Sequence, residues 1–240
     1  MRGPGRLADY LLISCEHGGN RVPPRYRPLF AGLHQALLTH RGYDCGALRM
    51  ARELSASFDA PIVASTVTRL LVDLNRSIGH PRLHAESVRR APREERDRIV
   101  AKHYLPYRER AENLIQGAVA RGRRVIHVAS HSFTPELNGK VRTADVGLLY
   151  DPRRAGERRT CAGWKAALHK ALPDLRVRRN YPYAGKDDGF MPFLRSRFRP
   201  SSYIGIEIEI NQAIVVGRPR DWAELRAAVV ESLRATVASR

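Results

Sequence analysis

Two kinds of hydrophobic pattern alternate along the chain. Compact apolar runs, typical of buried strands, are separated by longer segments in which apolar side chains recur every three or four residues, as on one face of a helix. The strand-like runs are residues 10–15, 61–67, 70–74, 125–129, 146–150, 175–179 and 203–210. Four segments are helix-like: one begins at Asp44, one at Pro92, one contains Cys161 and the last begins at Asp221. Pro106 is expected to kink the helix that begins at Pro92. This alternation predicts a single α/β domain over residues 1–240, with a mixed, mostly parallel sheet and helices on both faces.

The chain is strongly basic. Its 240 residues include 42 Lys and Arg against 24 Asp and Glu, which gives a formal net charge of +18 at pH 7. A field of this sign favours anionic partners. The basic residues are spread along the chain, apart from short clusters at 89–98, 121–124 and 195–199, and no known nucleic-acid-binding motif accompanies them. We therefore expect a small anionic substrate, and keep nucleic-acid binding as the less favoured alternative.

The apolar runs and the cysteines bear on the cellular setting. No uncharged apolar run approaches about 18 residues, so we expect no transmembrane helix and no membrane partner. Residues 1–6 are basic, but the apolar run that follows at 10–15 is too short for a secretory leader. Cys15, Cys45 and Cys161 are odd in number and widely spaced, which fits neither a disulfide framework nor a metal knuckle. These features predict a soluble cytoplasmic protein.

Histidines follow or end two of the predicted buried strands. His17 lies just after the first strand, before two glycines, and His131 ends the strand that begins at residue 125, with a serine on either side. Open α/β sheets bind ligands at the carboxyl ends of their strands. A single histidine at such a place is more often a hydrogen-bonded loop residue, but two of them can converge on one metal ion. A second chemistry, with Cys15 as nucleophile and His17 as base, lacks an evident third residue to orient the histidine.

Charged residues with catalytic potential occur on two further runs. The strand at 203–210 alternates with period two, so Glu207 and Glu209 point to the same face, and either carboxylate is a candidate general base or simply a solvated group. Arg69 stands directly before the run at 70–74, and it either polarises a carbonyl oxygen or is an ordinary surface partner of Asp73. Asn75 and Arg76 end that run, and such a pair suits bidentate binding of a carboxylate.

Seven segments in the same order resemble the N-formylglutamate amidohydrolase family, in its branch of predicted amidohydrolases. They are CEHGGN (15–20), THRGYDCGA (39–47), TRLLVDLNR (68–76), SHSFTP (130–135), VGLLYD (146–151), PYAGKD (182–187) and IEIEINQ (206–212). The resemblance covers residues 10–216. It extends more distantly to aspartoacylase and succinylglutamate desuccinylase, and therefore implies a zinc-carboxypeptidase-like α/β fold.

The resemblance implies a role for each matching residue. His17 and His131 match metal ligands, and the metal would be Zn²⁺ or another divalent ion. Arg69 would polarise the scissile carbonyl group, and Glu209 rather than Glu207 matches the general base. Substrate-binding positions are Asn75, Arg76, Arg41 and Gly185. The implied activity is metal-dependent hydrolysis of the amide bond of a small acidic N-acyl amino acid, similar to N-formylglutamate. The alternative is a basic anion- or nucleic-acid-binding protein on a catalytically degenerate hydrolase scaffold.

The chain departs from the family pattern at several of these positions. The related zinc enzymes have a glutamate three residues after the first histidine, where this chain has Asn20, a weak ligand for zinc. Glu16 or Asp44 is therefore an alternative third ligand. Asn211 and Ala213 stand where the late strand motif usually has Arg and Asp. We make no prediction of the oligomeric state.

Overall fold

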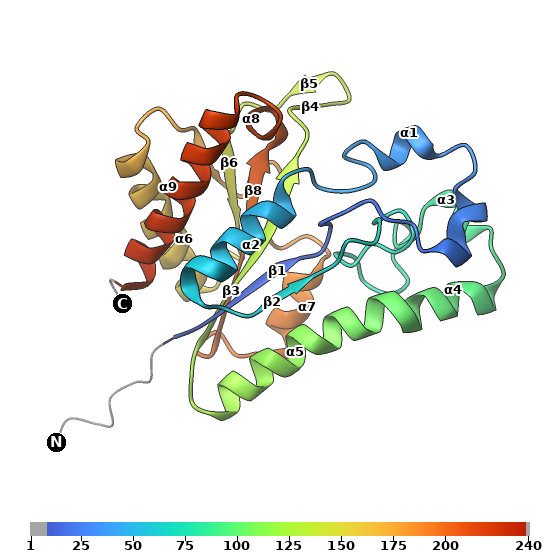
Figure 1. The fold of residues 1–240 in the computed structure, drawn as a ribbon. Coiled ribbons are helices and arrows are strands. Elements are labelled where there is room, and N and C mark those ends of the chain that lie inside the picture. Colours follow the sequence, from blue (N-terminus) through green and yellow to red (C-terminus); the bar gives the residue numbers. More distant parts are fainter. Residues whose placement is uncertain (1–8, 239–240) are drawn as a thin grey trace.

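A six-stranded sheet lies at the centre of the computed structural model, which describes residues 9–238 (Figure 1). The strand order is β2 (Ile62–Ala64), β1 (Tyr10–Cys15), β3 (Val125–Phe133), β8 (Tyr203–Asn211), β6 (Val146–Leu149) and β7 (Val177–Arg179). The first four strands run parallel, whereas β6 is antiparallel to β8 and parallel to β7. The predicted mixed, mostly parallel sheet is confirmed. The basic residues 1–6 lie outside the described part of the chain.

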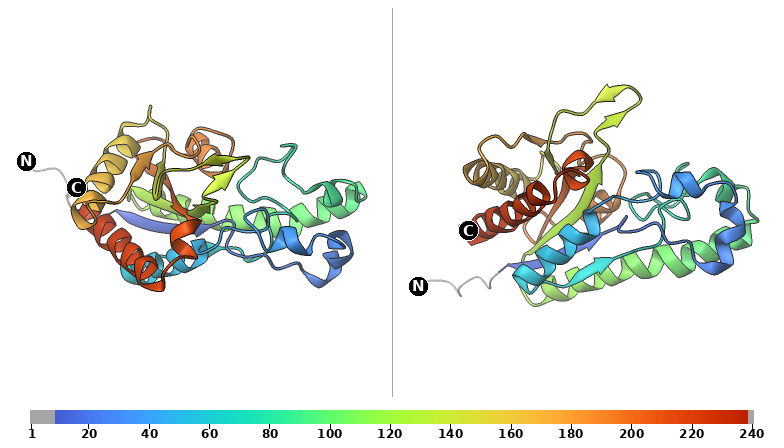
Figure 2. Two further views of the ribbon diagram at one scale, coloured as in Figure 1. Left: turned by 90° about the horizontal axis from the view of Figure 1, so that it is seen from above. Right: turned by 45° about the horizontal axis from the view of Figure 1, so that its top comes forward.

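Helices cover both faces of this sheet (Figures 1 and 2). One face packs against α2 (Ala47–Phe58), α6 (Ala155–Ala171) and α9 (Pro219–Ala238), and the other against α5 (Leu105–Ala120) and α7 (Phe190–Arg197). Successive side chains of a strand point to opposite faces. In β3, Ile126 and Val128 accordingly join the first core, and Val125 and Ala129 join the second. The predicted α/β architecture with two helical layers is confirmed.

The two central strands, β3 and β8, are buried along their whole length. Each is nine residues long, and every one of those residues is buried. Parallel strands covered on both faces are normally almost continuously apolar. The histidines and glutamates inside them, His127, His131, Glu207 and Glu209, are therefore exceptions that need partners or a function.

At the predicted kink near Pro106 the structure has a π-helical turn, and the helix continues beyond it. The helical rod along one side of the molecule in Figure 1 consists of α4 (Arg93–Ile99), a π-helical turn, η2 (Val100–Tyr104), and α5. Pro106 stands in the first turn of α5, directly after the π-turn. Proline has no N–H to donate, and the wider turn ahead of it accommodates this loss without breaking the rod.

Two strand predictions and two helix starts need correction. Residues 70–74 lie in turns and irregular backbone, in which Asp73 N donates to Leu83 O, and Leu71, Val72 and Leu74 are buried without strand pairing. The predicted strand at 61–67 is reduced to β2, with one isolated bridge further on. α2 begins at Ala47 rather than Asp44, and α9 begins at Pro219, two residues before Asp221. A short apolar run has the same sequence pattern in a paired strand and in a buried turn, so the pattern alone does not distinguish the two.

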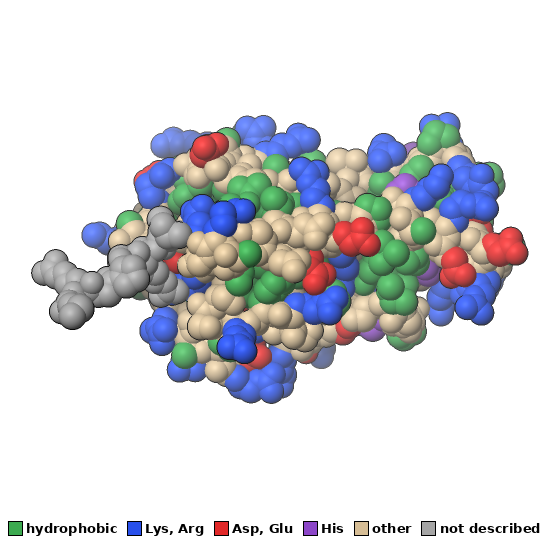
Figure 3. All heavy atoms as spheres, turned by 90° about the horizontal axis from the view of Figure 1, so that it is seen from below, with side chains coloured by type: hydrophobic (Ala, Val, Ile, Leu, Met, Phe, Trp, Pro, Cys, Tyr) green, Lys and Arg blue, Asp and Glu red, His purple; other side chains and the backbone are tan. Residues whose placement is uncertain are grey.

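The remaining elements are short and lie mainly around the carboxyl ends of the strands. They are the 3₁₀-helix η1 (Pro24–Phe30), α1 (His34–Leu37), α3 (Glu86–Arg89), β4 (Glu136–Leu137), β5 (Lys140–Val141) and α8 (Gln212–Val215). Within residues 9–238, no helix is both long and apolar enough to span a bilayer. On the face shown in Figure 3, Lys and Arg side chains are scattered, and they do not gather into one stripe.

Candidate functional site

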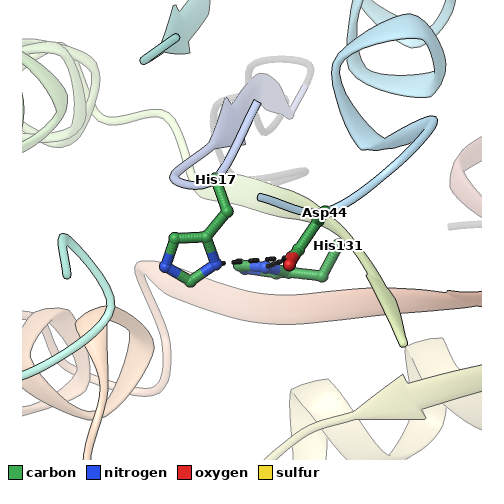
Figure 4. A group of neighbouring side chains, drawn as sticks. All are labelled: His17, Asp44 and His131. Atoms are coloured by element: carbon green, nitrogen blue, oxygen red, sulfur yellow. Dashed lines mark hydrogen bonds and ion pairs between the residues drawn. The ribbon is translucent and has the colours of Figure 1, made fainter. Parts of the chain in front are cut away.

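The carboxyl ends of β1 and β3 bring His17 and His131 together. These strands are parallel neighbours, and the two imidazole ring centroids lie 5.2 Å apart at an interplanar angle of 62°. Asp44 joins them from the loop before α2, where its main-chain N–H donates to His17 O over 2.9 Å. Figure 4 shows the three side chains pointing toward one another. All three are at most 4% exposed.

Both histidines direct the Nδ1 atom toward the same carboxylate oxygen. Asp44 Oδ2 lies 3.3 Å from His17 Nδ1 and 2.9 Å from His131 Nδ1. Burial by itself would raise the pKa of Asp44, but the neighbouring His17, His131 and Arg69 outweigh burial and hold this pKa well below its usual range. Asp44 is thus a carboxylate, and the three residues form a group with the composition and spacing of a metal site.

The outer nitrogen of each imidazole contacts a further carboxylate. His17 Nε2 lies 2.7 Å from Asp73 Oδ1, and His131 Nε2 lies 2.9 Å from Glu16 Oε2. Burial would raise the pKa of Glu16, but the contact with His131 lowers it to about 2. A carboxylate commonly lies against the second ring nitrogen of a metal-ligating histidine, and such a contact orients the ring.

Of the three alternatives for a third ligand, Asp44 is the one in this group. Glu16 lies on the far side of the His131 ring, against Nε2 rather than Nδ1. Asn20 lies elsewhere, since its amide Nδ2 donates to Leu37 O over 3.1 Å. The asparagine that replaces the expected glutamate is therefore part of a loop contact, and a carboxylate from a different segment stands in the cluster.

Arg69 is tied to the same carboxylates. Its Nη1 donates to Asp44 Oδ1 over 3.2 Å, while Nε and Nη2 donate to Asp73 Oδ2 over 3.3 and 2.8 Å. The sequence left two roles possible for Arg69, one of them an ion pair with Asp73 on the surface. The ion pair is present, but it lies at the candidate site. Three of the five guanidinium N–H groups are used in these contacts, which leaves two outside them.

Glu207 and Glu209 share the face of β8 that carries the site, as the alternation predicts. In the strand register Glu209 is opposite His131 and Glu207 is opposite Ala129. Glu207 Oε2 accepts a hydrogen bond from Asn75 Nδ2 over 3.3 Å, whereas Glu209 Oε2 is buried and has no partner among the described residues. Burial, together with the charges of Asp44 and Glu207, raises the pKa of Glu209 to about 8. The two glutamates therefore differ in their partners.

A cavity of about 670 Å³ connects these groups. His17, Asp44, His131 and both glutamates line it, together with the cationic side chains Arg41, Arg69, Arg76 and Arg82. A larger cavity of about 890 Å³ lies among Tyr10, Pro61 and Arg124, by the amino ends of β1 and β3, but no histidine lines it. The smaller cavity is therefore the chemically equipped one.

The predicted substrate-binding residues lie at or beside this cavity. Arg76 Nη1 donates to Asp188 O over 2.8 Å. Asn75 donates to Glu207 Oε2 through Nδ2 and accepts from Phe190 N through Oδ1 over 2.6 Å, so both ends of its amide are engaged with protein groups. Gly185 lies one residue beyond the lining residue Ala184, and a Cβ there would come within 2.2 Å of Tyr150 N. Only glycine lets this loop lie so close to the end of β6.

Sequence reasoning did not identify the contributions of Asp73 and Tyr107. Asp73 entered only as a partner of Arg69, although a lone carboxylate inside an apolar run was a signal that could have been followed. Tyr107 Oη donates to Glu16 Oε1 over 2.8 Å from the first turn of α5. One tyrosine in a helical pattern gives no such signal.

The site can be compared with known proteins. A gene product of Agrobacterium tumefaciens with a solved structure is 28% identical, with a TM-score of 0.82 over 96% of this chain and 91% of that chain. An N-formylglutamate amidohydrolase from Ralstonia eutropha is 20% identical, with a TM-score of 0.67 over 97% and 94%, and shows the fold alone. A metallo-carboxypeptidase from Burkholderia cenocepacia is 14% identical, with a TM-score of 0.42 over 99% and 59%, too low to support an argument.

No match was found among curated proteins. The model of one protein family, described as N-formylglutamate amidohydrolase, matches residues 10–216. That range includes His17, Asp44, His131 and Glu209 as well as all six strands of the central sheet. The chain therefore belongs to the N-formylglutamate amidohydrolase family.

Proposed function

We propose that this protein hydrolyses the amide bond of a small N-acyl amino acid that carries a carboxylate, such as an N-formylglutamate-like substrate, with the help of a divalent metal ion. Membership of the amidohydrolase family supports amide hydrolysis. The observation that supports the metal-dependent mechanism most directly is the buried His17–Asp44–His131 group beside Glu209, whose Oε2 has no hydrogen-bond partner within residues 9–238.

The donor atoms fit a catalytic zinc ion. Two imidazole nitrogens and one carboxylate oxygen are a common protein ligand set for such sites, and they leave a coordination position open. His17 Nδ1, His131 Nδ1 and Asp44 Oδ2 would hold the ion, while Asp73 and Glu16 hold the outer nitrogens. When bound, the metal would polarise the amide carbonyl and activate a water molecule for attack.

Glu209 would serve as the general base. Glu209 lines the cavity beside the His17–Asp44–His131 group, so its carboxylate can take a proton from the attacking water and return it to the leaving nitrogen. Its pKa of about 8 belongs to the protein without a metal. A nearby cation favours the charged form of a carboxylate, and so would lower this pKa toward neutrality.

Arginines would bind the two oxygen-rich ends of the substrate. The N–H groups of Arg69 that remain free would stabilise the negative charge that develops on the carbonyl oxygen during attack. Arg76 and Arg41 would bind the substrate carboxylate, because both line the cavity. Asn75 would position Glu207 rather than contact substrate, and Gly185 would seat the loop that closes this side of the cavity.

A substrate panel tests this proposal. N-formyl, N-acetyl and N-succinyl derivatives of glutamate and of a neutral amino acid would be incubated with protein stripped of metal and then loaded with Zn²⁺, and the release of free amine measured. We expect turnover of at least one acidic derivative only in the loaded protein, and none with Glu209→Gln. Equal turnover with and without metal would contradict the metal-dependent mechanism. Metal-free protein that binds nucleic acid with a steep salt dependence would favour the alternative function.

A further inference from the structure

The hydroxyl of Tyr107 links helix α5 to the back of the metal group. Tyr107 is buried, and its Oη lies 2.8 Å from Glu16 Oε1 and 3.1 Å from Val63 O. A hydroxyl has one proton to donate. The carboxylate is charged and closer than the carbonyl group, and charge-assisted hydrogen bonds are the stronger ones, so the proton goes to Glu16.

Glu16 in turn joins Tyr107 to His131. Its Oε1 accepts from Tyr107, and its Oε2 lies 2.9 Å from His131 Nε2. Glu16 is 1% exposed, so bulk water cannot replace either contact. The orientation of the carboxylate therefore depends on the protein groups around it, and the orientation of the His131 ring depends on the carboxylate.

We propose that Tyr107 is a positioning residue for the metal site, which acts through Glu16 on the ring of His131. This inference rests on the proposed function, since it assumes that His131 is a metal ligand. The contacts behind His17 differ: His17 Nε2 contacts Asp73, and Arg69 donates two hydrogen bonds to that carboxylate. Different residues therefore orient the two histidines: Asp73 and Arg69 lie behind His17, whereas Glu16 and the neutral phenol of Tyr107 lie behind His131.

Metal affinity gives a direct test that does not require turnover. Tyr107→Phe removes only the hydroxyl, and Zn²⁺ affinity would be measured by competition with a chromophoric chelator. Replacing a residue that directly holds a ligating histidine typically weakens metal binding about 10–100-fold. We expect that range for Glu16→Gln, and a smaller loss, about tenfold or less, for Tyr107→Phe because it acts one residue further away. The visible absorption spectrum of the Co²⁺-loaded variant should also change.

Two matched tyrosine variants separate positioning from general destabilisation. The hydroxyl of Tyr26 is buried and has no hydrogen-bond partner among the described residues, so Tyr26→Phe should leave Zn²⁺ affinity unchanged. Tyr104 Oη donates to Arg76 O over 2.7 Å, so Tyr104→Phe removes a hydroxyl close to Tyr107 along the chain that does not contact Glu16. It should also leave Zn²⁺ affinity unchanged. Thermal unfolding of each metal-free variant would show whether the fold is intact.

The double variant Glu16→Gln/Tyr107→Phe tests whether Tyr107 acts through Glu16. If it does, the double variant binds Zn²⁺ as weakly as Glu16→Gln alone, because contacting groups give non-additive effects. Additive losses, or unchanged affinity and Co²⁺ spectrum in a folded Tyr107→Phe, would overturn the inference and leave Val63 O as the functional partner of the hydroxyl. A wild-type protein that binds no metal would instead refute the proposed function and this inference with it.

Discussion

Glu209 on β8 lies directly opposite His131 on β3 in the parallel register, and its Oε2 is buried without a partner among the described residues. Most buried carboxylates in proteins are hydrogen-bonded, because an unpaired one is costly. The neighbouring Glu207 on the same face is held by Asn75. We therefore expect Glu209, rather than Glu207, to exchange protons with a substrate.

This difference predicts unequal effects of two otherwise identical substitutions. Glu209→Gln keeps size and shape but cannot accept a proton, so it should lower kcat by roughly 10²–10⁴ while metal remains bound. Glu207→Gln should cost far less turnover, since Glu207 is engaged with Asn75. Steady-state kinetics with zinc content measured on the same samples would test the ranking. The opposite ranking would move the base to Glu207.

The proposed ligands His17, Asp44 and His131 should control the zinc content of the protein. His17→Ala, His131→Ala and Asp44→Ala should each abolish stoichiometric Zn²⁺ binding, because each removes one of only three ligands. Asn20→Ala should retain it, since Asn20 bonds to Leu37 O outside the group. Elemental analysis of the folded variants would decide. Full zinc occupancy in the His131→Ala protein would show that the metal binds elsewhere.

Replacing Arg76 should affect the KM of acidic substrates more than that of neutral ones. Arg76→Ala should raise KM for an N-acylglutamate by roughly 10–100-fold, the loss expected for hydrogen bonds to a charged group. A neutral N-acyl amide should be affected little, which provides the control within one variant. Equal losses for both substrates would indicate that Arg76 serves only to hold Asp188 O through its Nη1.

The buried His127 should account for part of the loss of folding stability at low pH. Burial lowers the pKa of this side chain from 6.5 to about 4. The unfolded chain therefore takes up a proton at higher pH than the folded one, so stability is full above pH 6.5 and is lost as pH falls toward 4. The loss attributable to His127 is about 3 kcal/mol at most. Urea unfolding between these pH values should show a weaker pH dependence for His127→Gln, and parallel curves would contradict the assignment.

Some of this protein could be predicted from the sequence because the signal was local. The runs at 10–15, 125–129 and 203–210 became β1, β3 and β8, and the period-two alternation of β8 placed Glu207 and Glu209 on one face. Such alternation follows from the geometry of a single strand. The ends of β1 and β3 likewise predicted that His17 and His131 meet, since parallel strands bring their carboxyl ends to the same edge.

Other features were decided only by the tertiary structure. The apolar run at 70–74 is buried in turns, because loop packing hides those side chains as well as a sheet would. Asp44 joins His17 and His131, and Asn20 does not, because the loop before α2 folds back and bonds to His17 O. Tyr107 reaches Glu16 across 91 residues of sequence. Hydrophobic periodicity reports which side of one element is buried, whereas contacts between distant loops and helices follow from how the elements pack and leave no periodic pattern along the chain.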